Sequence, residues 1–205
     1  GMLVTAFLPV YMSVKKRLGQ EAASDYVSNL TSIVFVITMA VTLLSIVFAV
    51  QLVWTQSFSA AEGFDSDLAV WFFRFFAIEI VLYALSTIFS GVVNAERDYL
   101  WSSIAPIFNN VVTISSFLLY ALLVDNSPSL ALIILALGNP IGVFVQMALQ
   151  IPSMLRHGIR VRFRIDLSDP ALKDTLKIGV PSIAILVTSF VTASIQMNAP
   201  LSFTP

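Results

Sequence analysis

The sequence predicts an all-α fold, a polytopic bundle of transmembrane helices, and three observations predict it. Of the 205 residues, 58% are hydrophobic and 11% are charged, and the mean hydropathy is +0.89. A soluble domain carries roughly 25% charged residues, so this chain has too few to coat a core in water. Continuous apolar runs reach the length of about 20 residues that crosses a bilayer. The basic residues gather in alternate connections between these runs.

Five runs are the expected spans. They are continuously apolar, without the alternation of a strand, and far longer than the roughly 9–11 residues of a barrel strand. The opening run, residues 2–14, is too short to span and is interpreted as the end of a helix that starts upstream. No signal peptide is expected there, because no basic region or small-residue cleavage site accompanies it. The five runs are residues 30–54, 69–94, 104–124, 130–153 and 178–197.

Charge is sorted between the connections. The connections after residues 2–14, 69–94 and 130–153 are basic, whereas 55–68 and 125–129 contain no Lys or Arg. The positive-inside rule then places the basic connections in the cytoplasm, if each run crosses once. Helices of a soluble core would have no reason to sort charge in this way. The basic residues are Lys15, Lys16, Arg17, Arg97, Arg156, Arg160, Arg162, Arg164, Lys173 and Lys177, and the acidic ones of the other connections are Glu62, Asp65, Asp67 and Asp125.

The connection 155–177 is predicted to be a cytoplasmic basic loop that contains an amphipathic helix lying at the membrane interface. Asp169 followed by Pro170 is typical of an N-cap and a first-turn proline. Leu172 and Leu176 then share one face, and charged side chains occupy the others, as in an interfacial helix. An ordinary solvated helix between two spans is the alternative.

Arg74 and Glu79 are ionisable residues in the run 69–94 and are candidates for a cavity or a substrate path. They are five residues apart, about 140° around a helix, and are not expected to pair. Arg74 is near the outer end, where the alternative is that it snorkels to the surface. Glu79 is deeper. We expect either a cavity-facing or proton-coupled role for it, or a structural hydrogen bond to a neighbouring helix.

Asn109, Asn110 and Gln146 are candidates for the same path, with hydrogen bonding between helices as the alternative. No catalytic residue, metal site or cofactor is predicted. The sequence has no Cys, and its one His, His157, lies in a loop where solvation is the usual state. Four residues are expected to break or bend the spans, as transporters tolerate around a cavity, namely Pro106, Gly138, Pro140 and Pro181.

Short motifs along most of the chain resemble the MurJ/MviN family of lipid II flippases. Each motif alone is weak, and their order and spacing carry the resemblance, although the tail 198–205 departs from it. The motifs are Ala6-Phe7-Leu8-Pro9-Val10, Gly63-Phe64, Ser90-Gly91-Val92-Val93-Asn94, Ala105-Pro106-Ile107-Phe108-Asn109-Asn110, Gly142-Val143-Phe144-Val145-Gln146 with Gln150-Ile151-Pro152, and Arg164-Ile165-Asp166 with Pro181.

The resemblance implies the architecture of the MOP superfamily, in which two helical bundles surround a central cavity. Residues 1–205 would be one N-lobe-type region, from the end of helix two to helix seven. The implied partners are the bilayer and an undecaprenyl-linked peptidoglycan precursor, lipid II, with no nucleic acid. The implied function is movement of that lipid to the outer leaflet of the bacterial inner membrane by alternating access. Neither an enzyme activity nor a cofactor is implied, and transport is expected of the full-length protein.

Three other functions stay open. A sister exporter of a lipid-linked polysaccharide or a drug would share the architecture. A non-transporting membrane scaffold would also share it. A membrane-embedded transferase acting on polyprenyl phosphates should show clustered acidic or histidine residues in a cytoplasmic loop. The acidic residues here are instead scattered, at Glu96, Asp98, Asp166, Asp169 and Asp174.

Overall fold

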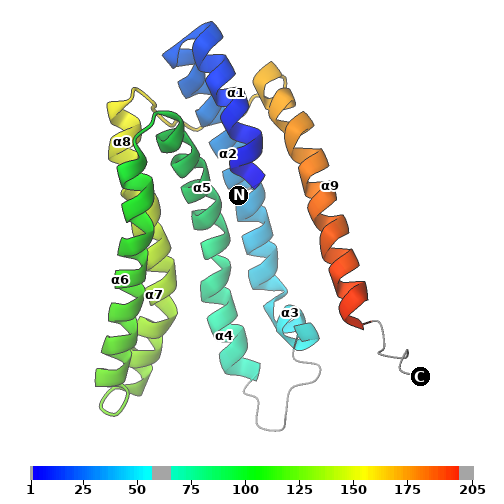
Figure 1. Cartoon of the computed structure of the whole chain (residues 1–205). Helices are drawn as coiled ribbons and strands as arrows, with labels where there is room; N and C mark the ends of the chain where they lie inside the picture. The colour runs from blue at the N-terminus through cyan, green and yellow to red at the C-terminus, as the bar shows by residue number, and fades with distance from the viewer. Residues whose placement is uncertain (1, 57–65, 199–205) are drawn as a thin grey trace, which may run out of the picture.

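The computed structural model describes residues 2–56 and 66–198, and all regular secondary structure within them is α-helical (Figure 1). The all-α prediction is therefore confirmed. The helices are α1 (Met2–Leu18), α2 (Gln20–Val47), α3 (Ala49–Gln56), α4 (Ser66–Ala77), α5 (Glu79–Ala95), α6 (Tyr99–Leu123), α7 (Pro128–Ala148), α8 (Ile151–Arg156) and α9 (Pro170–Asn198).

Five helical stretches are long and apolar enough to cross a membrane, which confirms the five predicted runs. Helices suit such runs because they satisfy every backbone group internally where water is absent. Large apolar side chains face outward on them: Leu44 is 58% exposed, Leu118 61% and Ile185 68%. Apolar surface on this scale needs lipid around it, so the chain is a multi-pass membrane protein. The stretches are Gln20–Val47, Asp67–Ala95, Tyr99–Leu123, Pro128–Arg156 and Pro170–Ala193.

The helix interruptions fall at other places than the sequence predicts. One lies at Phe48, between α2 and α3, and another at Ile78, between α4 and α5. At the second, the hydroxyl of Thr42 in α2 donates a hydrogen bond of 3.1 Å to the carbonyl of Ala77. The residues predicted to break or bend the spans lie inside continuous helices. A proline removes one backbone bond, and hydrocarbon favours keeping the rest. They are Pro106 in α6, Gly138 and Pro140 in α7, and Pro181 in α9.

The basic connections lie together at one end of the bundle. Figure 1 shows the turn between α1 and α2, the turn between α5 and α6, and the connection from α8 to α9 at this end. The turn between α6 and α7, which includes Asp125, lies at the opposite end. We call the first the basic end, because it carries Lys15, Arg97 and Arg160. The sorting of charge in the sequence is thus a sorting in space.

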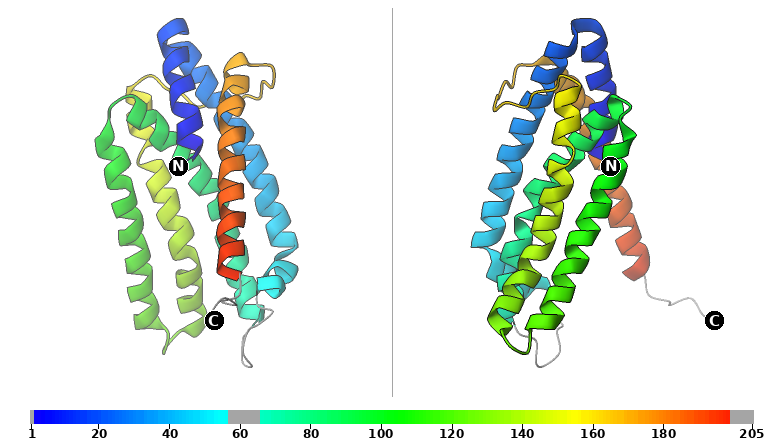
Figure 2. Two further views of the ribbon diagram at one scale, coloured as in Figure 1. Left: turned by 45° about the vertical axis from the view of Figure 1, so that its right-hand side comes forward. Right: turned by 90° about the vertical axis from the view of Figure 1, so that its left-hand side faces the viewer.

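A buried hydrophobic core lies at the basic end. The ring of Phe7 stacks on that of Tyr11, which is also in α1, with the ring centroids 5.4 Å apart. It stacks as well on the ring of Tyr26 in α2, at a centroid distance of 5.7 Å. These rings share a buried core with Ile159, which follows α8 in the chain. Farther from this end, α9 exposes its large apolar side chains from Val180 onward, as its separate course in Figures 1 and 2 illustrates. The bundle therefore holds α9 mainly by its first turns.

Small residues let α6 and α7 approach closely, and this pair forms the most extensive helix contact of the described residues. A Cβ atom added at Gly138 would lie 2.5 Å from the Cβ of Ser116. One added at Gly142 would lie 3.0 Å from the carbonyl oxygen of Asn109. The two glycines are four residues apart on one face of α7, which is the small-xxx-small arrangement of helix pairs in lipid.

We expect Gly138→Ala to lower the stability of the full-length protein by about 1–3 kcal/mol, because the new methyl group overlaps Ser116. The thermal midpoint of the purified protein in detergent measures the effect. Gly179→Ala is the matched control, because its Cβ would meet only the Cβ of Ala6, at 3.5 Å. An unchanged midpoint for Gly138→Ala would show that α6 and α7 do not pack as described.

Candidate functional site

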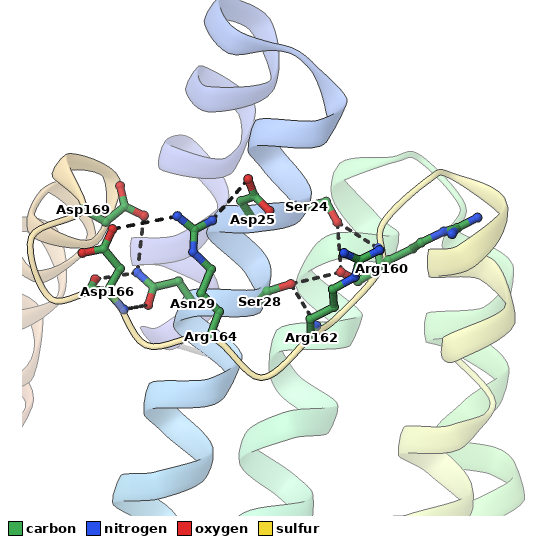
Figure 3. Close-up of polar contacts among 9 residues, drawn as sticks. All are labelled: Ser24, Asp25, Ser28, Asn29, Arg160, Arg162, Arg164, Asp166 and Asp169. Carbon is green, nitrogen blue, oxygen red and sulfur yellow. Dashed lines mark hydrogen bonds and ion pairs between the residues drawn. The ribbon is translucent and has the colours of Figure 1, made fainter.

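An extended segment, residues 159–166, runs along α2 and connects α8 to α9 (Figure 3). It belongs to no helix or sheet among the described residues, so its backbone groups need other partners. Ser24, Ser28 and Ser32 are spaced by four on α2, which sets them in one row about 6 Å apart. An extended chain advances about 6.6 Å every two residues. The row therefore matches every second residue of the segment.

The serine row binds the backbone of these alternate residues (Figure 3). Ser24 Oγ accepts a hydrogen bond from the N–H of Arg160 at 2.9 Å and donates one to its carbonyl at 3.0 Å. Ser28 Oγ donates to the same carbonyl at 3.0 Å and accepts from the N–H of Arg162 at 3.0 Å. The serine hydroxyls of α2 thus form the hydrogen bonds that the backbone of a neighbouring strand would form in a sheet.

Ser32 and Asn29 complete the series. Ser32 Oγ accepts from the N–H of Arg164 at 2.9 Å. The side chain of Asn29, which is completely buried, accepts from the N–H of Asp166 at 2.7 Å and donates to its carbonyl at 2.8 Å. We call Ser24, Ser28, Asn29 and Ser32 the α2 ladder.

The ladder leads directly into α9. Asp169 Oδ1 accepts from the N–H of Ala171 at 3.0 Å, which confirms Asp169 as the predicted cap of the helix. Asn29 donates a longer bond of 3.4 Å to Asp169 Oδ2, and a hydrogen bond joins the hydroxyls of Tyr26 and Thr175. α2 therefore anchors both the extended segment and the first turns of α9.

Arg164 reaches back toward the N-terminus of α2. Its guanidinium lies 3.2 Å from Asp25 and 3.9 Å from Asp166, although its own N–H is bonded to Ser32, two turns farther along α2. Hydrogen bonds from Ser168, with a smaller contribution from the charge of Arg164, lower the pKa of Asp166 below its usual value. Two carboxylates thus neutralise Arg164 locally.

A second polar cluster ties α1 to the turn after α5. Glu96, whose side chain is 8% exposed, accepts hydrogen bonds from Tyr11 at 2.5 Å and from Lys15 at 2.6 Å. Burial would raise the pKa of Glu96. The hydrogen bonds from Lys15 and Tyr11 and the charge of Lys15 outweigh burial and lower the pKa below its usual value. Glu96 is therefore held as a carboxylate at the basic end.

Arg74 and Glu79 lie apart from each other, as predicted, and no ion pair joins them among the described residues. The Arg74 side chain is exposed on α4. Glu79 is the first residue of α5, directly after the interruption at Ile78, and is half-buried. Its Oε1 atom is buried and finds no hydrogen-bond partner in the described part of the chain.

The structure brings Asn109 and Gln146 together, because Asn109 Nδ2 donates a hydrogen bond of 2.7 Å to Gln146 Oε1. One turn along, Thr113 donates to Asn139 Oδ1 at 3.2 Å. These bonds join α6 to α7. Asn110 lies outside this network, on an exposed face of α6.

A family model described as lipid II flippase MurJ matches residues 1–201. The chain belongs to this flippase family. The match reaches into the tail 198–205, so the predicted departure of that tail from the family is wrong up to residue 201. The lipid II flippase MurJ of Burkholderia cenocepacia is 28% identical to this chain over 159 residues. The aligned region covers 75% of the chain and 29% of the relative, so the chain spans less than a third of the relative's length.

The motifs that resemble the MurJ family are contact points between helices. A Cβ atom at Gly91 would lie 3.1 Å from the ring of Phe7, where the motifs 90–94 and 6–10 meet. Ser90 Oγ donates to the buried side chain of Gln150 at 2.6 Å. The motif Gly63-Phe64 lies outside the described residues. The motifs at 6–10, 90–94 and 150–152 thus include residues that set how the helices pack.

The α2 ladder is the feature that sequence reasoning missed. Within the predicted cytoplasmic loop, residues 159–166 are extended, and Pro170 starts α9, which continues through the span as one helix. The sequence indicated a helix that begins at Pro170, and the structure shows that this helix and the predicted run 178–197 are one element. Two signals could have revealed the ladder: the spacing of Ser24, Ser28 and Ser32, and the strand-like alternation of arginine and apolar residues after Ile159.

We expect amide-resolved hydrogen exchange to alternate along the extended segment, with slow exchange at Arg160, Arg162 and Arg164. Ser28→Ala should speed exchange at Arg162 about fivefold, since a hydrogen bond contributes about 1 kcal/mol. Ser115→Ala is the control, because this hydroxyl donates to the Val111 carbonyl of its own helix and, among the described residues, to no part of the segment. Uniformly fast exchange through the segment would contradict the ladder.

Proposed function

We propose that the chain is part of a lipid II flippase, which moves the undecaprenyl-linked peptidoglycan precursor from the cytoplasmic to the outer leaflet of the bacterial inner membrane. The family match over residues 1–201 carries this proposal. The five apolar stretches support it, since a flippase must present helices to lipid on its outside. Transport of this kind forms and breaks no covalent bond, so no catalytic residue is assigned.

We propose that the basic end faces the cytoplasm. Cations gather at this end, and the described turn between α6 and α7 at the other end contains none. The positive-inside rule favours this orientation. The substrate would then enter from the side of Lys15, Arg97 and Arg160. Their charge suits the approach of a pyrophosphate-linked lipid.

The packing supports alternating access as the mechanism. Polar clusters fasten the basic end, at the α2 ladder and at Glu96, while α9 exposes most of its length beyond Val180. A helix held by its first turns can change its angle without breaking those contacts. Movement of α9 about the basic end is one way in which a cavity could open to alternate sides.

Five residues are proposed for the substrate path, with different support. Glu79 has the strongest support, because its buried Oε1 atom lacks a partner among the described residues. Arg74 and Asn110 are exposed and available to a ligand or to lipid. Asn109 and Gln146 bind each other, so a substrate would have to replace that bond.

The full-length protein that contains this chain, reconstituted into vesicles, should expose fluorescently labelled lipid II to a membrane-impermeant quencher. Unlabelled lipid II should compete, because it shares the headgroup. A lipid-linked O-antigen precursor and a teichoic-acid precursor should not. Competition by one of these lipids instead would assign the protein to a sister exporter, and quenching equal to that of protein-free vesicles would contradict transport.

In the same assay, we expect Glu79→Gln to remove the pH dependence of flipping, if Glu79 exchanges a proton during transport. Glutamine keeps the shape and the hydrogen-bonding capacity but cannot ionise, so an unchanged rate and pH profile would leave only a structural role. Other charges on helices packed against α5 are Lys15, Lys16, Arg17, Glu21, Asp25, Asp67, Arg74 and Arg156, and α6 and α7 carry none. Glu21→Gln, at the exposed start of α2, is the matched control.

A further inference from the structure

The extended segment has two chemically different faces. Side chains of successive residues in an extended chain point to opposite sides, so Arg160 and Arg162 share one face and Val161 and Phe163 share the other. The ladder binds backbone groups of Arg160, Arg162, Arg164 and Asp166, every second residue of the segment. Phe163 is 74% exposed, and Val161 is also exposed. The α2 ladder therefore displays an amphipathic strand on the surface of the bundle.

We infer the depth of the segment in the membrane from the apolar side chains of α2. The apolar run of α2 begins at Leu30, and its first exposed large apolar side chain is Val36, so the hydrocarbon edge falls between them. Ser32 lies in this interval, and Ser24 is two turns, about 12 Å, farther out. A headgroup layer is about 5–8 Å thick on each side of a bilayer. A strand bonded from Ser24 to Ser32 thus crosses that layer.

The arginines differ in whether their charge is matched. Arg164 forms an ion pair with Asp25 at 3.2 Å. Arg160 and Arg162 are exposed and have no ion pair within residues 2–56 and 66–198. A guanidinium matches the geometry of a phosphate oxygen pair, and Phe is among the apolar side chains that interfacial segments bury at the boundary between headgroups and acyl chains. Arg160 and Arg162, beside the exposed ring of Phe163, are therefore suited to bind a negatively charged phospholipid surface.

We propose that residues 160–165 form a binding surface for anionic phospholipids of the cytoplasmic leaflet. Arg160 and Arg162 contact the lipid phosphates, and Phe163 inserts between the upper acyl chains together with Val161. The ladder fixes the strand at this depth, so lipid binding also braces the connection to α9. This surface needs only the membrane orientation proposed above and does not depend on which lipid the protein transports.

The test uses the full-length protein and Arg160→Gln/Arg162→Gln, extracted in mild detergent from vesicles of phosphatidylcholine and phosphatidylglycerol. Mass spectrometry measures the ratio of retained lipids. The unmodified protein should prefer phosphatidylglycerol, and each arginine should account for a factor of about five in that preference. The matched control is Lys16→Gln/Arg97→Gln, which removes two exposed cations of the basic end that are not part of the extended segment.

A nitroxide label at Phe163→Cys gives an independent readout of depth. In vesicles, its collisions with oxygen should exceed those with a water-soluble nickel complex, and a label at Arg97→Cys should show the reverse. An unchanged lipid preference in the double variant would overturn the proposal. So would a water-exposed label at position 163, or displacement of phosphatidylglycerol by equimolar lipid II, which would assign the surface to the substrate. No outcome of this test depends on flipping activity.

Discussion

The organisation of this chain depends on how the backbone of residues 159–166 is satisfied. An extended segment has backbone N–H and C=O groups that need partners, and this one has no neighbouring strand among the described residues. Four side chains of α2 bind these groups at every second residue, because the repeat of four residues on a helix nearly equals that of two on a strand. The distances, between 2.7 and 3.2 Å, are those of full hydrogen bonds. The connection from α8 to α9 becomes part of the bundle rather than a loose linker.

This constraint divides the molecule into regions of different packing. At the basic end, aromatic rings, the ladder and the cluster around Glu96 combine α1, α2, α5 and α9. Toward the other end, contact is carried by pairs of helices, above all α6 with α7 through Gly138 and Gly142. Strong polar contacts near water and close apolar packing in hydrocarbon are what each environment favours.

Glu79 departs from this division. It lies within an apolar stretch, at the interruption between α4 and α5, and one oxygen has no partner in the described residues. A carboxylate in hydrocarbon costs a few kcal/mol and is usually retained for function. Asn109 and Gln146 also lie in apolar helices, yet they satisfy each other. Glu79 therefore differs from Asn109 and Gln146 in lacking a hydrogen-bond partner for one buried oxygen among the described residues.

Sequence by itself determined the helical class, the five crossing runs and the separation of basic from acidic connections. Each of these follows from the cost of placing charge or unpaired backbone in hydrocarbon, which depends on composition along the chain. The family also followed from short motifs in a fixed order, and the family model that matches residues 1–201 confirms it. The helix cap at Asp169 could also be predicted from the sequence, because capping depends only on neighbouring residues.

Only the tertiary structure decided which polar groups meet. The ladder joins residues 130 to 137 positions apart, and neither Ser28 nor Arg162 indicates its partner. The same holds for Tyr11 and Glu96, 85 positions apart, and for the pairing of Asn109 with Gln146. Periodicity along one helix tells which side chains share a face. It does not tell which element that face will meet, because the packing of all the helices sets that contact.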